Sequence, residues 1–345
     1  MLTVALDAEH TRQSAAGIAR YARSLARELT AQGLANVIEL GAGEVVPRGT
    51  LAKKFLTARQ DFLWYPWLAR RAARRQGADI YHVPLPRGPV SRTSLPFVVT
   101  VHDLVPIRFP ETTTRWSRLY GQLTFRRILS AADRIIAPSQ NTADDLATLA
   151  GVPADKIRVV PNGVDEIFFT QGSDKAPVAK PYVLFVGTPE PRKNLERLIS
   201  AITLLRSRGM RERLMIVGTG GWGARAPVAD TVEYLGGVTD EELLTLYAHA
   251  SCLALPSLHE GFGLTALEAM AVGTPVVAAN SGALPEVTGG AAVLVDPLNP
   301  AAIADGISQA IADRDSLVMR GRVRAREFSW KRTASLTAEV YRELL

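Results

Sequence analysis

The chain has 345 residues, of which 47% are hydrophobic and 21% are charged, so it is expected to fold rather than to stay disordered. A chain of this length is expected to form two domains of ordinary size. Its single cysteine excludes a disulfide framework and a cysteine-based metal cluster. Residues 1–7 resemble no secretory signal, and no apolar run approaches the roughly 20 residues that span a bilayer. These features predict a cytoplasmic protein.

Positive charge is concentrated in the first half of the chain. The net charge is +6, and residues 1–172 hold 22 Lys and Arg against 15 Asp and Glu, whereas residues 173–345 hold 18 against 19. The excess gathers in Arg70, Arg71, Arg74, Arg75, Arg87 and Arg92, with Lys53, Lys54 and Arg59 nearby. Such a surface attracts phosphate groups of nucleic acid or of an anionic membrane, although it could also be a solvated arginine-rich face. Few aromatic residues (7%) accompany the cluster, which argues against nucleic acid as a partner.

Short runs of Val, Ile and Leu alternate with helical patterns along the chain, which is typical of βαβ units and parallel sheets. The first half contains six expected strands, at 3–7, 37–40, 79–83, 97–102, 134–137 and 158–161. The second half contains six more, at 182–186, 214–217, 232–235, 252–255, 275–278 and 292–295. Residues 165–181 lack periodicity and are expected to be a linker. We therefore expect doubly wound domains at 1–165 and 166–327, with a helix at 328–345 that could cross back to the first.

Ligands of doubly wound domains bind at the carboxyl ends of the strands, and three residues of the first half fall near such ends. Gly17 precedes a helix and could let the chain turn tightly and offer amides to an anion. The segment lacks the glycine fingerprint of a nicotinamide-dependent dehydrogenase, which excludes that class. His102 directly follows a buried strand and could bond sugar hydroxyls or a developing charge, or be structural. His82 is a weaker candidate of the same kind.

The strand at 182–186 is followed by a loop suited to an anion. Gly187 and Thr188 close the strand, and two prolines stiffen the loop before Arg192 and Lys193. A helix is expected to begin near Asn194. Two cations beside a helix N-terminus suit a diphosphate, although an exposed basic turn is the alternative.

The segment 257–275 carries the strongest pattern. Gly261 and Gly263 allow the backbone to approach a ligand closely, and the helix expected from Leu264 would direct its amides toward it. Glu260 lies in the loop and Glu268 just over one turn into the helix. Carboxylates accept bonds from paired sugar hydroxyls, so the two suit a nucleotide sugar, with Glu260 on the transferred sugar and Glu268 on the ribose. A simple interaction of Glu268 with the helix dipole is the alternative.

The two glutamates stand in an E-x7-E spacing within PSLHEGFGLTALEAMAVGTPVV, which resembles the signature of retaining glycosyltransferases of family 4. The segments VGTPEPRKNLERLI, VVPNGVD, TVHDLVPIRFPE and FSWKRTA resemble other parts of that family, so the resemblance spans nearly the whole chain. It implies the GT-B fold, an α/β architecture of two doubly wound Rossmann-like domains that face each other across a cleft. It also implies a retaining hexosyltransferase that needs no cofactor and no metal.

The resemblance implies roles position by position. Lys193, with Arg192 beside it, would hold the diphosphate, Glu260 the donor sugar, and Glu268 the ribose. Gly187, Thr188 and Gly261 would complete the donor site. Amides of Phe262, Gly263 and Leu264 would lie near the phosphate and sugar. His102 would act on the reacting sugar together with Glu260 and Lys193, while Gly17, and more weakly His82, would lie on the acceptor side. Many members carry arginine where this chain has Thr188, so the cationic role should rest on Arg192 and Lys193.

The loop GTPEPRKN and the segment HDLVPIRFPE are similar to bacterial mannosyl- and rhamnosyltransferases of surface-polysaccharide assembly, which favours GDP-mannose as the donor. The basic first half suits a glycan acceptor on a polyprenyl diphosphate, met at the inner face of the cytoplasmic membrane, where Arg70, Arg71, Arg74 and Arg75 would promote binding to anionic vesicles. A soluble glycan acceptor stays open. So do a UDP-sugar-dependent transferase of the same fold and a nucleotide-sugar-binding relative without turnover.

Overall fold

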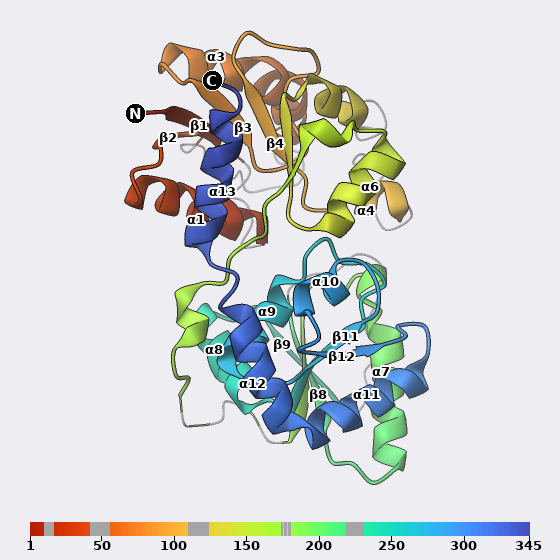
Figure 1. Ribbon diagram of the computed structural model, residues 1–345. Helices are drawn as coiled ribbons and strands as arrows, with labels where there is room; N and C mark the ends of the chain where they lie inside the picture. Colours follow the sequence, from red (N-terminus) through yellow and green to blue (C-terminus); the bar gives the residue numbers. More distant parts are fainter. Residues whose placement is uncertain are drawn as a thin grey trace. The chain divides into compact units, whose positions relative to one another are not determined.

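A computed structural model gives the structure of the chain. It describes residues 1–9, 17–41, 56–109, 124–173, 175, 178, 181–218 and 231–345. The chain divides into two compact units (Figure 1). The first consists of residues 1–163 together with 330–345, and the second of residues 164–329.

The first unit is built on a six-stranded parallel sheet with the strand order β2-β1-β3-β4-β5-β6. Its strands are β1 (Thr3–Asp7), β2 (Asn36–Leu40), β3 (Ile80–Val83), β4 (Phe97–Thr100), β5 (Arg134–Ala137) and β6 (Ile157–Val159). All six lie where the apolar runs predict them, to within one or two residues at each end. Because β4 ends at Thr100, His102 lies in the loop that follows the strand rather than within it.

Helices cover both faces of this sheet. They are α1 (Gly17–Ala31), a π-helical turn η2 (Gln60–Leu68), α3 (Ala69–Arg75), α4 (Val105–Arg108), α6 (Gln140–Ala150), the short 3-10 turn η4 (Ala154–Lys156) and the C-terminal α13 (Trp330–Arg342). The side chains of Val4 and Ile80 pack with α1 and α13 on one face, while their neighbours Ala5 and Tyr81 pack with α3 on the other. Helices α1 and α13 contact each other, so the C-terminal helix packs on the first unit (Figure 1).

The second unit repeats the plan, with a six-stranded parallel sheet in the order β12-β11-β10-β7-β8-β9. Its strands are β7 (Tyr182–Val186), β8 (Arg213–Val217), β9 (Val232–Gly236), β10 (Cys252–Leu255), β11 (Val276–Ala279) and β12 (Val293–Val295). Its helices are α7 (Leu195–Ser207), α8 (Asp240–His249), α9 (Leu264–Val272), α10 (Leu284–Thr288), α11 (Pro300–Ala312) and α12 (Arg314–Ala325), with short 3-10 turns η5 (Glu166–Phe169) and η6 (Pro191–Lys193). The two predicted doubly wound sheets are thereby confirmed.

The expected linker at 165–181 is wrong in its first part. Residues of η5 pack into the core of the second unit, where Phe168 is fully buried and its ring lies edge-on to Tyr247 at 6.0 Å between centroids. Three successive apolar residues, Ile167, Phe168 and Phe169, supply this contact although they show no periodicity. A short apolar turn can therefore anchor a chain crossing without forming a regular element.

The predicted basic cluster is only partly a charged surface. Arg87 forms an ion pair with the buried Asp61 and lies 5.4 Å from the centroid of the Tyr65 ring, so it belongs to the interior of the first unit. Arg59 lies 4.0 Å from a carboxylate oxygen of Glu9. Lys53 and Lys54 fall outside the described residues. Among the described residues, no helix combines the length and apolar character that crossing a membrane requires.

Candidate functional site

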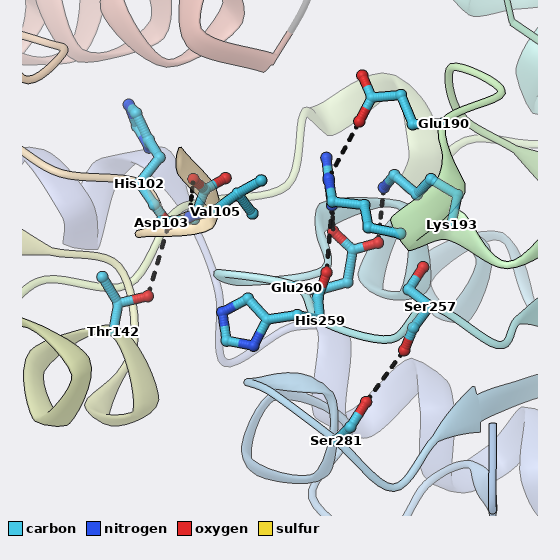
Figure 2. A network of polar contacts seen from close by, with 11 residues as sticks. His102, Asp103, Val105, Thr142, Glu190, Lys193, Ser257, His259, Glu260 and Ser281 are labelled. Carbon is cyan, nitrogen blue, oxygen red and sulfur yellow. Dashed lines mark hydrogen bonds and ion pairs between the residues drawn. The ribbon is translucent and has the colours of Figure 1, made fainter. Parts of the chain in front are cut away.

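Two loops at the carboxyl end of the second sheet bring three charged side chains together (Figure 2). Lys193, in the loop after β7, donates from Nζ to Oε1 of Glu260, in the loop after β10, at 2.6 Å. Arg192 donates from Nη1 to Oε2 of Glu260 and to the carbonyl oxygen of His259, both at 3.2 Å. Its Nε donates to Oε2 of Glu190 at 3.1 Å. The carboxylate of Glu260 is thus bound on both oxygens by the cations that the sequence predicts for a diphosphate.

The two cations keep Glu260 ionised in a buried place. Burial of this side chain acts to raise its pKa, but the charges of Lys193 and Arg192 outweigh burial and lower the pKa to about 2. The site is therefore close to charge balance when no ligand is present. An incoming anion would meet cations that already have a fixed position.

Asn194 fixes the loop that carries both cations. Its φ is 60°, and it is the one non-glycine residue with positive φ in the described part of the chain. The side-chain amide of Asn194 donates to the carbonyl oxygens of Pro256 at 2.9 Å and of Pro297 at 2.6 Å. The backbone N–H of Leu258 donates to the carbonyl of Arg192 at 2.7 Å. These bonds join the two loops, so the strained backbone of Asn194 is held by contacts with distant residues.

Gly187 and Thr188 close β7 as predicted, and the structure adds a residue that sequence reasoning missed. The N–H of Gly187 donates to the carbonyl of Val217 at 2.9 Å. A Cβ on Gly218 would overlap the carbonyl oxygen of Gly187, so only glycine allows the ends of β7 and β8 to approach this closely. The sequence contained an indication of this residue, because Gly218 directly follows an expected strand.

The backbone of Glu260 rests on the loop after β11, which sequence reasoning also missed. The N–H of Ala283 donates to the carbonyl of Glu260 at 2.9 Å, and Ser281 Oγ donates to the carbonyl of Ser257 at 3.0 Å (Figure 2). Gly282 has φ of 58°, and a Cβ there would lie 2.7 Å from the carbonyl oxygen of Glu260. Nothing in the local sequence indicates this contact, because the partners come from separate strand ends.

Helix α9 begins at Leu264, as predicted, and its N-terminus has no side-chain cap. The N-cap is Gly263, in the left-handed conformation with φ of 98°, and no side chain bonds the first turn. Uncapped N–H groups and the helix dipole favour an anion at this place. The side chain of Phe262 is buried and does not face a ligand. Its ring contacts that of Phe328 edge-on, with 5.8 Å between the centroids.

Glu268 is buried one turn into α9 and is positioned by a residue that the sequence did not indicate. The hydroxyl of Tyr247 donates to Oε2 of Glu268 at 3.1 Å. Tyr247 is fully buried on α8, and the Thr274 hydroxyl donates to its carbonyl at 2.7 Å. The carboxylate therefore has a fixed orientation, which an interaction with the helix dipole alone would not give.

His102 lies in the first unit, in the loop after β4. Its Nε2 is 3.0 Å from the carbonyl oxygen of Pro84, and since a carbonyl only accepts, Nε2 carries the hydrogen. Its ring packs edge-on against Tyr21 at 4.9 Å between centroids. Burial lowers the pKa of His102, although the charge of Asp103 acts in the opposite direction. The imidazole is held neutral, with Nδ1 as its acceptor nitrogen.

The prediction of His82 as an acceptor-side residue is corrected by the structure. His82 lies within β3 and is fully buried, 2.7 Å from the Tyr341 hydroxyl through Nδ1 and 2.8 Å from the Thr100 hydroxyl through Nε2. Burial lowers its pKa to about 3. It is a neutral core histidine beneath α13. Gly17 begins α1, and nothing in the described part of the chain lies within 4 Å of the place that its Cβ would occupy, so the described residues show no tight approach there.

A buried acidic cluster at the end of β1 was not predicted. Asp7 Oδ2 accepts from the Tyr81 hydroxyl at 2.8 Å and from the Trp64 indole at 3.1 Å. Glu9 Oε1 accepts from the side-chain amide of Gln60 at 3.1 Å. Burial raises the pKa of Asp7 to about 7, against the effect of its hydrogen bonds. Asp7 was visible in the sequence as the end of a strand, but its surroundings include Trp64 and Tyr81, which lie more than fifty positions away.

Two cations, a fixed carboxylate and an uncapped helix N-terminus at the carboxyl end of a parallel sheet can bind a phosphate group and sugar hydroxyls together. In the part of the chain that the structure describes, no three His, Cys, Asp or Glu side chains are grouped as a metal site would require. This fold with this site defines the class of nucleotide-sugar transferases with the GT-B fold.

Comparison with known proteins gives the family. Residues 15–168 match the model of "Glycosyltransferase Family 4" and residues 167–327 that of "Glycosyl transferases group 1". O-antigen chain mannosyltransferase B of Escherichia coli is 33% identical over 267 residues, which are 72% of this chain and 70% of that relative. D-inositol 3-phosphate glycosyltransferase of Salinispora arenicola is 33% identical over 294 residues, which are 73% of this chain and 64% of that relative. The chain belongs to this family of retaining glycosyltransferases, which transfer a sugar from a nucleotide sugar.

Solved structures share the fold over the whole chain. Sucrose-phosphate synthase from Thermosynechococcus elongatus has a TM-score of 0.78 at 21% identity and covers 100% of this chain and 99% of its own. Anabaena HepE, solved in complex with UDP and glucose, has a TM-score of 0.74 at 19% identity, with 99% of this chain and 100% of its own covered. At these identities the likeness concerns the fold alone.

Proposed function

We propose that the chain transfers mannose from GDP-mannose to a glycan acceptor, with retention of the anomeric configuration. The observation that carries the proposal is the group of Lys193, Arg192 and Glu260 beside the uncapped N-terminus of α9. The choice of mannose follows from the 33% identity to O-antigen chain mannosyltransferase B.

In this proposal each donor group contacts a side chain of the second unit. Lys193 and Arg192 bind the diphosphate, together with the N–H groups at the start of α9. Glu260 accepts hydrogen bonds from hydroxyls of the transferred sugar, and Glu268 accepts them from the ribose. The fixed orientation of both carboxylates supports these roles, because a hydroxyl pair needs an acceptor at a defined place.

In the transfer step, the bond between the anomeric carbon and the diphosphate oxygen breaks, and the acceptor hydroxyl oxygen bonds to the same carbon from the same face. The hydroxyl proton passes to the departing diphosphate. Negative charge grows on that diphosphate, so Lys193, Arg192 and the amides of α9 would lower the barrier by preorganised charge. His102, held neutral, would bond a hydroxyl of the reacting sugar through Nδ1.

We propose a glycan on a polyprenyl diphosphate as the acceptor, met at the inner face of the cytoplasmic membrane. The identity to the O-antigen chain enzyme and the arginines of α3 support this acceptor. A soluble glycan is the alternative, and Gly17 would lie on the acceptor side in either case.

A UDP-sugar is the second candidate donor; HepE, which shares the fold, was solved with UDP and glucose. A thermal-shift comparison of GDP, UDP, ADP and their sugars decides between the donors, because a ligand that binds the folded state raises the melting temperature. A shift selective for GDP and GDP-mannose supports the proposal, and one selective for UDP replaces it. Hydrolysis of the preferred donor by the purified protein excludes a binding-only relative.

A further inference from the structure

The π-helical turn η2 of the first unit has its polar and apolar faces reversed. Gln60 and Asp61 are 1% exposed, whereas Phe62 and Leu63 are 57% and 53% exposed. Trp67 and Leu68, at the end of the same turn, are 49% and 42% exposed. A surface helix of a soluble protein ordinarily buries its apolar side chains and exposes the polar ones.

Contacts beneath η2 hold this orientation in place. The amide of Gln60 donates to Glu9 at 3.1 Å, and Asp61 pairs with Arg87. The indole of Trp64 donates to Asp7 at 3.1 Å. Because the inner face is bonded to the end of β1, η2 cannot rotate to bury its outer side chains without breaking these bonds.

Helix α3 follows η2 without a break and adds positive charge (Figure 1). Its sequence is ARRAARR, in which Arg71, Arg74 and Arg75 are exposed and Arg70 is half-buried. No acidic residue stands between Asp61 and Asp79. Large apolar side chains, including a tryptophan, therefore stand next to four arginines in a stretch of sequence that contains no carboxylate.

We propose that η2 and α3 form a membrane-docking surface whose apolar side chains Leu63, Trp67 and Leu68 enter the boundary between headgroups and acyl chains of an anionic bilayer. The four arginines of α3 then bind lipid phosphates. Tryptophan favours this interfacial depth, and arginine stems can lie along apolar surface while the guanidinium reaches phosphate. A second copy of the chain is a poorer partner, because it would bring eight arginines together.

This inference depends on the first unit alone and not on the donor. It deepens the proposed acceptor, since a docked enzyme would meet a lipid-linked glycan at the bilayer surface. Vesicle binding needs no turnover, so its absence would leave the transferase proposal standing. Its presence would not depend on which nucleotide sugar is the donor.

Flotation of the full-length protein with vesicles tests the proposal, using one set of phosphatidylglycerol and phosphatidylethanolamine and one of phosphatidylcholine alone. The test variant is Leu63→Gln with Trp67→Gln. The matched control is Met319→Gln with Val323→Gln on α12, whose side chains are 66% and 60% exposed on the second unit. A second variant, Arg71→Gln with Arg74→Gln and Arg75→Gln, tests the charge. Circular dichroism and melting temperature check that each variant folds.

We expect the wild type and the control to float with anionic vesicles and to bind phosphatidylcholine vesicles much more weakly. Loss of two apolar side chains should weaken partitioning at least about tenfold, and loss of three arginines should weaken it on anionic vesicles by a similar factor or more. Brominated lipid should quench the fluorescence of Trp67. The contribution of Trp67 is the difference in fluorescence between the wild type and Trp67→Phe. Equal flotation of the apolar variant and the wild type would overturn the proposal. So would a wild type that does not bind vesicles but dimerises with rising concentration, if the apolar variant abolishes that dimerisation.

Discussion

Lys193 and Glu260 are 67 positions apart in the chain, and the ammonium of one lies 2.6 Å from the carboxylate of the other. Both side chains are largely buried, at 13% and 11% exposed. A buried carboxylate that loses such a partner is strongly destabilised, so each of the two groups depends on the other. In the proposed function, the pair keeps two groups in place before the donor arrives: the ammonium that binds the diphosphate, and the carboxylate that accepts hydrogen bonds from the sugar hydroxyls.

Replacing Glu260 with glutamine should reduce kcat by about 10²–10³-fold with the fold intact, because the sugar hydroxyls lose a charged acceptor while the shape is kept. Initial rates with the preferred donor measure the effect. Glu190→Gln is the matched control, since the side chain of Glu190 also accepts from Arg192, whereas the ammonium of Lys193 donates to Glu260. Near-normal turnover of Glu260→Gln would remove this residue from the proposed machinery.

Tyr247→Phe should raise KM for the donor with a smaller effect on kcat, because Glu268 loses the hydroxyl that orients it toward the ribose. Loss of one hydrogen bond to a buried carboxylate costs about 1.5–3 kcal/mol. Tyr182→Phe is the control, since its buried hydroxyl donates to the carbonyl of Leu246 at 2.8 Å and does not touch Glu268. An equal change of KM in both variants would indicate a general loss of stability and would count against the ribose role.

Gly282→Ala should weaken donor binding and lower the melting temperature. The new Cβ would lie 2.7 Å from the carbonyl oxygen of Glu260 and must displace it. Gly290→Ala is the control, because Gly290 also has positive φ, 80°, but nothing lies within 4 Å of its Cβ position. The control should show only the strain of a left-handed alanine, about 1–2 kcal/mol. Equal melting temperatures and donor affinities in the two variants would contradict the supporting role of Gly282.

The pKa of Asp7 predicts an unusual pH dependence of stability. Burial raises this pKa to about 7 from its ordinary value of 3.8, so between these two pH values the folded state keeps a proton that the unfolded state has lost. Stability from this group is therefore full below about pH 4, falls as the pH rises toward 7, and stays low above 7.

Asp7→Asn should remove this pH dependence, so its stability relative to that of the wild type should be more favourable at pH 8 than at pH 4. Urea unfolding at the two pH values measures it. Asp79→Asn is a control, because this exposed residue accepts only from the N–H of Thr3. A destabilised Asp7→Asn at pH 8 would show that the carboxylate is needed in its charged form.

The pH dependence of stability that Glu260 contributes has the opposite sign to that of Asp7. Its pKa is lowered to about 2, so its contribution to stability is present above about pH 4.5 and is lost as the pH falls toward 2. Lys193→Met removes the first of the two charges that lower the pKa, and the acid-unfolding midpoint should move to higher pH. Circular dichroism across pH 2–6 measures the midpoint. An unchanged midpoint would mean that Lys193 does not hold the charge of Glu260.

The strands could be predicted because both sheets are parallel and buried on two faces, so each strand is a nearly continuous apolar run. The starts of α7 and α9 were also visible, since Asn194 and Gly263 interrupt the pattern where each helix begins. Local signals of this kind placed Lys193 and Glu260 at neighbouring strand ends.

The errors arise where a distant residue decides the outcome. His82 stands near a strand end in the sequence, but Tyr341 is 259 positions away and covers it. The outward apolar face of η2 depends on the bonds of Gln60 and Trp64 to residues at the end of β1. No local pattern contains these contacts, so sequence reasoning could not predict them.

A crystal structure of the chain with a nucleotide sugar bound tests the central claim most directly. The proposal predicts diphosphate oxygens within hydrogen-bonding distance of Lys193 Nζ and of the N–H groups at the start of α9, with Glu260 against hydroxyls of the sugar. Diphosphate bound in the second unit away from Lys193 and α9, or a sugar that leaves Glu260 untouched, would contradict it.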